Sequence, residues 1–460
     1  MIARDGREGW GALARFLKRG VLFVFALAGL TSAAAAAAAG EGYQPPANAP
    51  DVPFSAATGT RDPEARIRVP AGFRVTVFAD HLGRTRHLAA RADGTLYASL
   101  SQPVEGAGIV ALKDTDGDGR ADVVRRFGRV SGTGIAVHGD GLYFGENRRI
   151  LRFALKAGEM LPTGAPQVVV DGFPEQGQHA TKPMTFDDAG HMYVTVGAPS
   201  NACQQRMRTA GSPGLMPCPQ RRLQAGIWRY DADRTGQRHG RDGKRFVTGI
   251  RNALGLDWNH AAGALFFATH GRDQLYSLWP QYYTPAESAE LPGEEFHRAV
   301  EGDDYGWPYT YWDQLRGVRM KAPEYGGDGR MVENDPKYRS PLYAFPGHWA
   351  PMDLVFYEGR AFPAFFQHGA FIVFHGSWNR APLPQEGYLV AFVPMDAAGR
   401  VSGRPIVFAD GFKGHEPLAS PRKAAFRPSG LAIGPDGALY VCEDKTGRIW
   451  KISRQENPAR

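Results

Sequence analysis

The sequence predicts an all-β protein, a six-bladed β-propeller. Two observations predict this fold class. A short apolar strand runs six times through a Gly-bearing turn into a second, aromatic-rich strand, and few helical patterns lie between these hairpins. Hairpins that cannot bury their faces alone must stack on others, and six of them that close into a ring form a propeller. The loops of such blades converge at one end of a central channel, where we expect the functional site.

Each hairpin has its own turn glycine. Gly, or Asp-Gly, supplies the positive φ of a tight turn, and the alternating apolar residues that follow suit a half-buried strand. In chain order the second strands read ADGTLYASL (Gly94), GDGLYFGEN (Gly141), DAGHMYVTVG (Gly190), AAGALFFATHG (Gly263), QHGAFIVFHG (Gly369) and PDGALYVCED (Gly437). The glycines are 47 to 106 residues apart, which indicates degenerate blades with loop insertions.

Residues 1–40 have the layout of a secretory signal peptide. A segment with five Lys or Arg residues precedes the apolar run VLFVFALAGLTSAAAAAAAG. Its small residues suit cleavage near Ala39, whereas the alternative interpretation is an uncleaved membrane anchor. We therefore expect a periplasmic or secreted protein with no stable membrane insertion after the signal is cleaved.

The charge balance gives no support to a nucleic-acid partner. The whole chain has a formal net charge of +7, but residues 1–40 contain five of its basic and two of its acidic residues. The remaining chain has a net charge of +4 and no dense Lys/Arg run. Nucleic-acid binding is therefore not expected.

The remaining chain is predicted to be a linker followed by one domain. Residues 41–66 are rich in Pro, Ala and Gly and are predicted to be the linker, and residues 67–455 the propeller. A long insertion is expected at about 280–350, a stretch dense in aromatic residues, Pro and charge. Pro and Gly exclude a long helix there, while the aromatics indicate packing. We expect this insertion to shape a ligand site; the alternative is bracing between blades.

The chain has three cysteines. In an exported protein Cys203 and Cys218 could close a local disulfide across a Gly/Pro-rich loop, which leaves Cys442 in the last strand. An unpaired arrangement is equally open at this point. Since no C-x-x-C-H occurs, we expect no covalently attached c-type haem.

The Asp-rich loop DTDGDGRAD follows an EF-hand-like count. Asp114, Asp116, Asp118 and Asp122 occupy positions 1, 3, 5 and 9. Carboxylates two residues apart can converge on a hard cation such as Ca²⁺. The twelfth position is Arg125, where an EF-hand needs a bidentate Glu, so the EF-hand is incomplete. A metal-binding loop and a solvated Asp/Gly turn are both open interpretations, and each predicts a structural role.

Common enzyme motifs are missing, among them G-x-G-x-x-G, Walker A, G-x-S-x-G and H-E-x-x-H. The chain instead has GQHATKPMTF, TGIRNALGLDW, THGRD, HGSWNR and FRPSG just beyond strand ends. In this order, with Y-G-W-P from Tyr305 and H-x-A-P from His348, they resemble the glucose/sorbosone dehydrogenase family, and its sorbosone dehydrogenase-like branch in particular. The resemblance covers residues 65–455.

The resemblance implies a soluble six-bladed enzyme that oxidises an aldose sugar or a related aldehyde with pyrroloquinoline quinone (PQQ) and Ca²⁺. It implies His179 as the general base, because a neutral His suits removal of a hydroxyl proton at pH 7. Arg251 is implied as the cation that stabilises charge on the reduced quinone. Without haem, the electrons must pass to an external acceptor, a cytochrome or a quinone.

The resemblance also implies residues that bind the cofactor and a metal ion. The implied cofactor-binding residues are Asn252, His348, Arg380 and Arg427, since a guanidinium fork matches the PQQ carboxylates. The backbone carbonyls of Gly271 and Arg272 are implied to hold Ca²⁺, which polarises the quinone. For each side chain the alternative is a structural role, such as a salt-bridged Arg or a capping Asn.

Two positions depart from the family pattern. Ala198 stands where the glucose dehydrogenases have a carboxylate that orients the catalytic His, and Ser429 replaces a second arginine. Either another group orients His179 or its basicity differs, and the PQQ carboxylates are expected to be held more loosely.

Two other functions are weighed against the dehydrogenase. A Ca²⁺-dependent propeller lactonase or hydrolase would use converging channel carboxylates, and the run of Arg, His and Asn disfavours it. A non-catalytic propeller that binds glycans or protein has no need of the set His179, Arg251 and Arg427.

Overall fold

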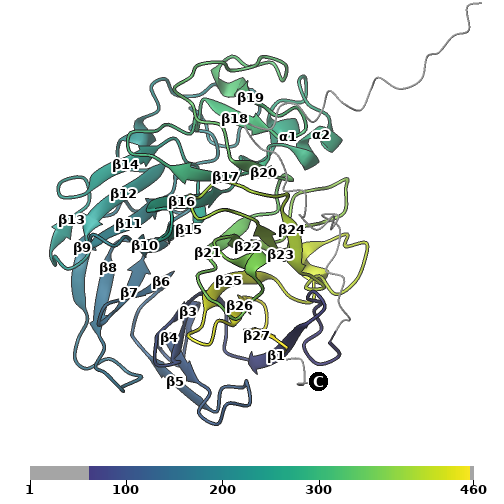
Figure 1. The fold of residues 1–460 in the computed structure, drawn as a ribbon. Coiled ribbons are helices and arrows are strands. Elements are labelled where there is room, and N and C mark those ends of the chain that lie inside the picture. The colour runs from purple at the N-terminus through teal and green to yellow at the C-terminus, as the bar shows by residue number, and fades with distance from the viewer. Residues whose placement is uncertain (1–61, 456–460) are drawn as a thin grey trace, which may run out of the picture. The chain divides into compact units, whose positions relative to one another are not determined.

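The computed structural model describes residues 62–455, which form a ring of six antiparallel sheets (Figure 1). The predicted all-β, six-bladed propeller is confirmed. The innermost strand of each sheet contacts the innermost strands of both neighbouring sheets, so the ring closes on itself. The predicted signal peptide and residues 41–61 of the predicted linker lie outside the described residues.

Blades 1 to 3 follow one another along the chain. Blade 1 contains β2 (Thr85–Ala90), β3 (Leu96–Val104), β4 (Ala107–Lys113) and β5 (Val123–Phe127). Blade 2 contains β6 (Gly132–His138), β7 (Gly141–Glu146), β8 (Ile150–Ala154) and β9 (Gln167–Asp171), to which β13 (Gln237–Arg238) adds in parallel. Blade 3 contains β10 (Met184–Phe186), β11 (His191–Val196), β12 (Gly226–Asp231) and β14 (Lys244–Thr248).

Blades 4 to 6 complete the ring. Blade 4 contains β15 (Ala253–Asn259), β16 (Ala264–Thr269), β17 (Glu294–Ala299) and β20 (Tyr343–Phe345). Blade 5 contains β21 (Pro351–Phe356), β22 (Ala370–His375), β23 (Tyr388–Val393) and β24 (Ile406–Ala409). Blade 6 contains β25 (Pro428–Ile433), β26 (Leu439–Glu443), β27 (Ile449–Arg454) and β1 (Phe73–Ala79).

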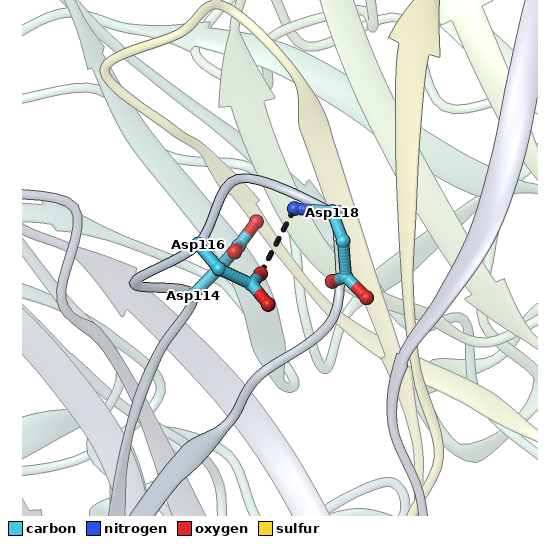
Figure 2. A group of neighbouring side chains, drawn as sticks. All are labelled: Asp114, Asp116 and Asp118. Atoms are coloured by element: carbon cyan, nitrogen blue, oxygen red, sulfur yellow. Dashed lines mark hydrogen bonds between the residues drawn. The ribbon is translucent and has the colours of Figure 1, made fainter.

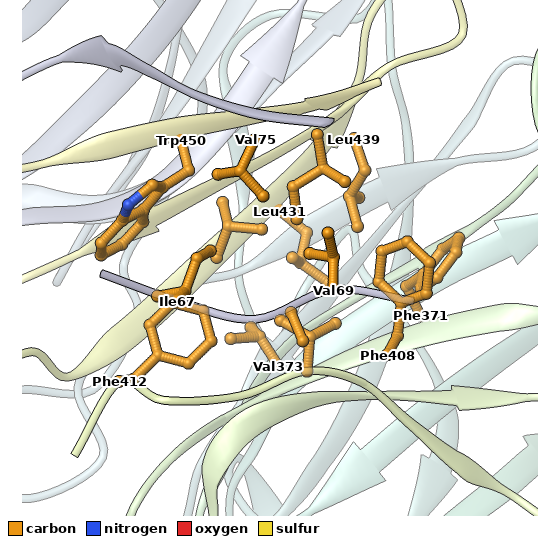
Figure 3. Packing of buried hydrophobic residues seen from close by; sticks show 14 of the residues in the cluster. Ile67, Val69, Val75, Phe371, Val373, Phe408, Phe412, Leu431, Leu439 and Trp450 are labelled. Atoms are coloured by element: carbon orange, nitrogen blue, oxygen red, sulfur yellow. The ribbon is translucent and has the colours of Figure 1, made fainter. Parts of the chain in front are cut away.

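The first strand of the described chain closes the ring. β1 pairs with β27 in antiparallel register, with Val75 opposite Ile452. Ile67 and Val69, which precede β1, lie between side chains of blades 5 and 6 (Figure 3). Blade 6 therefore contains both ends of the described chain, and residues from both ends share one apolar core. The two ends are also joined by a hydrogen bond from Trp450 Nε1 to the carbonyl of Ala65, 385 positions away.

The six predicted turns all lie between the first and second strands of a blade. Gly94, Gly190, Gly263 and Gly437 have the predicted positive φ. The prediction is wrong for the other two turns, because the positive φ belongs to Gly139 instead of Gly141 and to His368 instead of Gly369. At Gly369 a side chain would instead collide with Phe392, whose ring lies 2.1 Å from the position of a Cβ atom.

Two buried carboxyl groups join the inner strands of neighbouring blades. Asp257 of blade 4 accepts a hydrogen bond from the Phe356 N–H of blade 5 (2.9 Å). Asp353 of blade 5 accepts one from the Leu431 N–H of blade 6 (2.9 Å). Burial raises the pKa of Asp257 to about 7 and that of Asp353 well above its usual range, because a charged carboxylate is poorly solvated there.

Blade 4 carries the long excursion of the chain. The stretch at about 280–350, predicted as one insertion, contains two strands of blade 4, so the excursion is divided. Its first part, before β17, contains α1 (Leu275–Leu278) and α2 (Pro285–Glu290). Its second part, before β20, contains β18 (Thr310–Asp313), β19 (Val318–Lys321) and the 3₁₀ turn η2 (Pro323–Tyr325).

The two parts pack on each other beside one end of the propeller (Figure 1). They share a buried core that comprises Leu275, Leu278, Trp279, Tyr283, Leu291, Tyr311, Met320 and Ala322. Three further 3₁₀ turns lie elsewhere: η1 (Pro219–Arg222), η3 (Ala364–Phe366) and η4 (Pro421–Lys423). Within residues 62–455 no helix has the length and apolar character needed to span a membrane.

We expect Phe73→Ala to destabilise the protein by about 3–5 kcal/mol, because it removes a buried ring from the strand that closes the ring of blades. Phe73 makes edge-to-face contacts with Phe362, Phe366 and Phe408, at centroid distances of 4.8, 5.5 and 5.1 Å. Urea denaturation measures the loss. Arg74→Ala, on the exposed face of the same strand, is the matched control, and equal losses in both variants would contradict the assignment.

Candidate active site

A cavity of about 180 Å³ lies where loops of blades 3, 4 and 5 meet at one end of the channel. Most of its wall comes from segments that precede the inner strands β10, β15 and β21 or follow β16. Its lining residues are His179, Arg208, Arg251, His270, Gly271, Asp273, Glu294, His348, Ala350, Trp378 and Asn379. The channel itself forms a second cavity of about 400 Å³, lined by inner-strand residues of all six blades.

His179 lies in the cavity wall with its ring fixed by a backbone group. Its Nδ1 is 2.6 Å from the Ala198 carbonyl oxygen. A carbonyl can only accept, so Nδ1 carries the proton and Nε2 is the unprotonated nitrogen. The group that orients His179 is thus the backbone of Ala198, at the position where the sequence lacks a carboxylate. Burial and the nearby Arg251 lower the His179 pKa to about 3.

Gly197 allows His179 to sit this close to β11. A Cβ atom on Gly197 would lie 2.6 Å from the His179 Cβ, 2.8 Å from the His179 carbonyl oxygen and 3.0 Å from Asn252 Oδ1. These distances leave no room for any side chain. His179 itself has a φ of 53°, an uncommon conformation for a non-glycine residue.

Asp273 is the charged centre of the cavity. Its carboxylate accepts hydrogen bonds from Arg251 Nη2 (2.8 Å), Asn379 Nδ2 (3.0 Å) and Arg208 Nη2 (3.3 Å). Asn201 binds its backbone on both sides, with both distances 2.9 Å. Burial alone would raise the Asp273 pKa, but the guanidinium groups of Arg251 and Arg208 contribute to lowering it to about 2. Asp273 is therefore an anion, and it holds Arg251, which is 5% exposed, in place.

Three other titratable groups in the wall are kept neutral. His270 donates from Nε2 to the Pro351 carbonyl (2.7 Å), and burial lowers its pKa to about 4. His348 donates from Nε2 to the Ser288 carbonyl (2.9 Å), and burial lowers its pKa as well. Glu294 accepts from the Gly271 N–H (2.9 Å), and burial raises its pKa to about 8.

Asn252, implied by the resemblance as a cofactor ligand, is buried behind the cavity wall. Its Nδ2 lies 3.5 Å from His270 Nδ1, the nitrogen that the Pro351 contact leaves unprotonated. Asn252 thereby fixes the second side of the His270 ring. Its backbone carbonyl accepts from the Thr269 hydroxyl (3.1 Å), which ties the start of β15 to the end of β16.

The segment Gly271–Arg272, implied as a backbone metal ligand, is oriented by the blade 4 excursion. The Arg272 side chain points away from the cavity and forms a buried ion pair with Glu324, which also accepts from Trp279 Nε1 (2.9 Å). Within residues 62–455 no hydrogen bond reaches the carbonyl oxygen of Gly271 or of Arg272. These two hard oxygen donors are the groups that the fold leaves available for a cation.

The two arginines implied for the PQQ carboxylates lie outside the cavity wall. The Arg380 prediction does not fit its contacts, because its guanidinium is bound to Glu290 (2.6 Å) and to three backbone carbonyls. It braces the excursion against blade 5. Arg427 donates to the Gly376 carbonyl (2.8 Å) and the His375 carbonyl (3.3 Å), and half-buried beside Asp444 it is the more accessible of the two.

Six lining residues received no role from the sequence: Arg208, His270, Asp273, Glu294, Ala350 and Asn379. Asp273 and Asn379 do fall within the quoted segments THGRD and HGSWNR. Trp378, beside Asn379, is 56% exposed at the cavity, so it is not a core residue. Arg208 and Glu294 have no local pattern that marks them, since only the fold brings them to His179.

The Asp-rich loop lies in blade 1, on the connection between β4 and β5. Asp114, Asp116 and Asp118 each offer a carboxylate oxygen, and these oxygens lie within 4.8 Å of one another (Figure 2). Asp122, predicted as a fourth member, instead accepts from the Thr115 N–H (3.2 Å) and hydroxyl (2.5 Å). The loop is separate from the His179 cavity.

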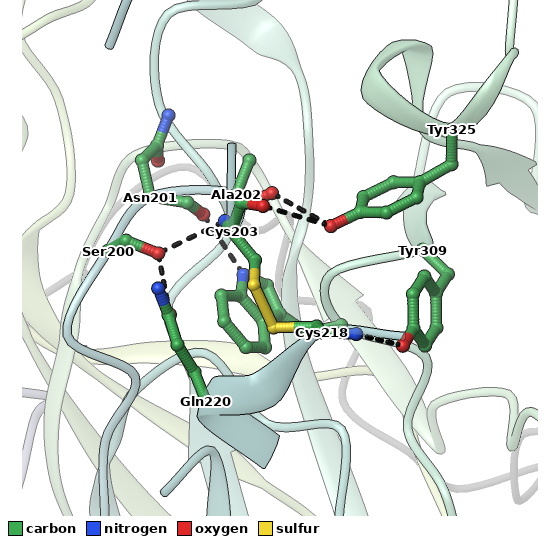
Figure 4. The surroundings of a disulfide bond; sticks show 9 residues. Ser200, Asn201, Ala202, Cys203, Cys218, Gln220, Tyr309 and Tyr325 are labelled. Atoms are coloured by element: carbon green, nitrogen blue, oxygen red, sulfur yellow. Dashed lines mark hydrogen bonds between the residues drawn. A yellow bond between two sulfur atoms is a disulfide. The ribbon is translucent and has the colours of Figure 1, made fainter. Parts of the chain in front are cut away.

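Cys203 and Cys218 form a disulfide, and Cys442 is a buried free thiol. Tyr309 and Tyr325 of the blade 4 excursion lie beside the disulfide, together with residues of the blade 3 loop such as Ser200 and Gln220 (Figure 4). The Cys218 N–H donates to the Tyr309 hydroxyl (2.9 Å), and the Tyr325 hydroxyl donates to the Ala202 carbonyl (3.2 Å). The disulfide thus closes a loop that is anchored between blade 3 and blade 4.

Comparison with known proteins gives matches over nearly all of the described chain. The family model described as TrAA12-like matches residues 67–455. A pyrroloquinoline quinone-dependent pyranose dehydrogenase of Coprinopsis cinerea is 27% identical over 298 residues, which are 54% of this chain and 37% of that protein. An uncharacterised Borreliella burgdorferi protein is 26% identical over 208 residues, 44% of this chain and 47% of that protein. The chain thus spans less than half the length of these relatives.

Solved structures show the same fold. The holo PQQ domain of the Coprinopsis cinerea pyranose dehydrogenase superposes with a TM-score of 0.67 at 20% identity, covering 87% of this chain and 100% of that one. A calcium structure of a Trichoderma reesei member of Carbohydrate-Active Enzymes family AA12 gives 0.68 at 16% identity, covering 87% and 99%.

We expect Gly197→Ala to displace the His179 ring and to destabilise the protein by about 1–3 kcal/mol, because the new methyl group overlaps His179. Gly177→Ala, in the loop before β10 that carries His179, is the control: no atom lies within 4 Å of its Cβ position, so its effect should stay within about 0.5 kcal/mol. Chemical denaturation compares the two. If Gly197→Ala were as stable as Gly177→Ala, the close packing of His179 on β11 would be refuted.

Proposed function

The chain belongs to the TrAA12-like family, and on that premise we propose that it is a PQQ- and calcium-dependent dehydrogenase that oxidises a sugar at its cavity. The observation that carries the proposal is the neutral His179, whose unprotonated Nε2 lies in the wall of a polar cavity beside a fixed arginine. A relative over 54% of the chain is a PQQ-dependent pyranose dehydrogenase, which supports the same cofactor here.

The residues of the cavity fit a planar, anionic cofactor. Asn379 Oδ1 is buried and has no hydrogen-bond partner among the described residues, so it is free to accept a hydrogen bond from a ligand. Arg251 and Arg208 contribute positive charge to the cavity wall, whereas Arg427 lies outside that wall and is bound to the Gly376 carbonyl. When bound, PQQ supplies a quinone that accepts hydride. The unpartnered carbonyls of Gly271 and Arg272 would hold Ca²⁺ beside it, with no charged ligand from their side chains.

The chain's own residues then perform the proton chemistry. His179 Nε2 would accept the proton of the C1 hydroxyl; together with the hydride that C1 gives up, the sugar would lose two protons and two electrons in all. The Ala198 carbonyl keeps the ring oriented and stabilises the imidazolium that forms. Arg251, anchored by Asp273, places a fixed positive charge at the site, where it stabilises negative charge at no reorganisation cost.

The substrate is proposed to be an aldose or pyranose sugar, with a sorbosone-like aldehyde as the finer possibility from the sequence. The electrons are proposed to pass to an external acceptor, a cytochrome or a quinone, and the enzyme to act in the periplasm or outside the cell. The lactonase alternative has little support from the cavity: of its two carboxyl groups, Glu294 is neutral and Asp273 is engaged by Arg251.

We expect metal-stripped protein to reduce a redox dye with aldoses only after both PQQ and Ca²⁺ are added. His179→Asn should lower kcat by about 10²–10⁴-fold, because it removes the base while it keeps a polar side chain. His415→Asn is the control, since His415 is exposed and outside the cavity wall. If PQQ did not bind at all, the lactonase and the glycan- or protein-binding propeller would take precedence.

We expect the acidic limb of the kcat/KM profile to lie well below pH 6.5. His179 must be neutral to accept a proton, and burial with Arg251 lowers its pKa to about 3, so protonation removes the base only near that pH. Activity measured from pH 4 to pH 8 should therefore show no loss from His179 between pH 7 and pH 5. A limb with a midpoint near 6.5 that disappears in His179→Asn would show that the ring is not desolvated as described.

A further inference from the structure

Three charged side chains lie close together in the cavity wall. Arg251 Nη2 lies 2.8 Å and Arg208 Nη2 lies 3.3 Å from the Asp273 carboxylate. One carboxylate is therefore shared by two guanidinium groups, and the cavity as a whole suits an anionic ligand.

Arg208 is more exposed than Arg251, and its contact with Asp273 is longer. Arg251 is 5% exposed and donates to Asp273 at 2.8 Å. The Arg208 side chain is 29% exposed, and its Nη2 lies 3.3 Å from Asp273 Oδ2 and 3.4 Å from Gln178 Oε1. Both distances are long for a charge-assisted hydrogen bond. A ligand oxygen could replace them at little cost, whereas it could not displace the Arg251 pair.

The position of Arg208 is built into the loop between Cys203 and Cys218. The Gln204 amide lies inside this loop: its Oε1 accepts from the Arg208 N–H (2.9 Å), and its Nε2 donates to the carbonyls of Thr209 and Ser212, both at 3.2 Å. The backbone of Arg208 has a φ of 51°, a conformation that persists only where surrounding contacts fix it. Gln274, after the Gly271–Arg272 segment, accepts from Arg208 Nη1.

We infer that Arg208 binds a carboxylate group of the ligand in this cavity and that the loop closed by Cys203 and Cys218 is the element that presents it. The inference rests on the proposed function, because the cavity is the one assigned there to the cofactor and the sugar. A guanidinium group has two parallel N–H donors that match the two oxygens of a carboxylate, which a single ammonium cannot do.

The carboxylate can come from two sources. PQQ carries carboxylates, and an acidic sugar, such as a uronic acid, carries one. In both cases the ligand group has the same charge and planar shape, so the geometry of Arg208 does not separate them. The experiment must do so.

We would titrate calcium-loaded protein by calorimetry with PQQ and, separately, with D-glucuronate, so that binding is read without turnover. Arg208→Gln should weaken the binding of one of these ligands about 10- to 100-fold, because the substitution removes a charge-assisted pair. Arg208→Lys should restore only part of the affinity, since it keeps the charge and loses the fork. Arg206→Gln, an exposed residue of the same loop, is the control.

Weaker PQQ binding in Arg208→Gln assigns the carboxylate to the cofactor, and weaker D-glucuronate binding with unchanged PQQ binding assigns it to the substrate. The inference is overturned if Arg208→Gln binds both ligands as tightly as Arg206→Gln, or if the native protein binds neither. Native protein that binds D-glucuronate but not PQQ would overturn the proposed dehydrogenase while the D-glucuronate arm still tests Arg208.

Discussion

The pairing of β1 with β27 is the interaction on which the rest of the structure depends, because it converts six sheets in sequence into a closed ring. Only in a closed ring do the starts of the inner strands face one another across a channel. His179 precedes β10, Arg251 precedes β15 and His348 precedes β21, so three blades each deliver one side chain to one cavity.

Within that ring, burial determines the protonation state of most titratable groups in the cavity wall more strongly than local charge pairs do. Desolvation disfavours charge on each imidazole and on Glu294, so these groups serve as neutral acceptors or donors. Asp273 stays ionised because cations surround it. One buried anion thus fixes the Arg251 guanidinium in the cavity wall, and the neutral groups around it do not compete for that charge.

The sequence allowed the fold to be predicted because the signal for each hairpin is local. Apolar alternation around a turn marks two strands, although it could not distinguish Gly141 from Gly139 as the residue with positive φ. Residues of the candidate cavity were predictable only where a motif contained them, as for His179 and Arg251. Arg380 shows the limit: the motif marks its position, but Glu290, 90 positions away, binds its guanidinium group. The Ala198 carbonyl could not be foreseen either, since every residue has one.

The excursion of blade 4 has its own buried core and is joined to the segment beside the cavity by contacts such as the ion pair between Glu324 and Arg272. Substitutions in the excursion can therefore accumulate with little effect on the packing of the ring. Substitutions, insertions or deletions in its surface turns would change the rim of the cavity while the strand pairings of the six blades persist. A lineage can in this way alter the excursion while the ring stays folded, which makes the excursion the natural place for divergence between related proteins.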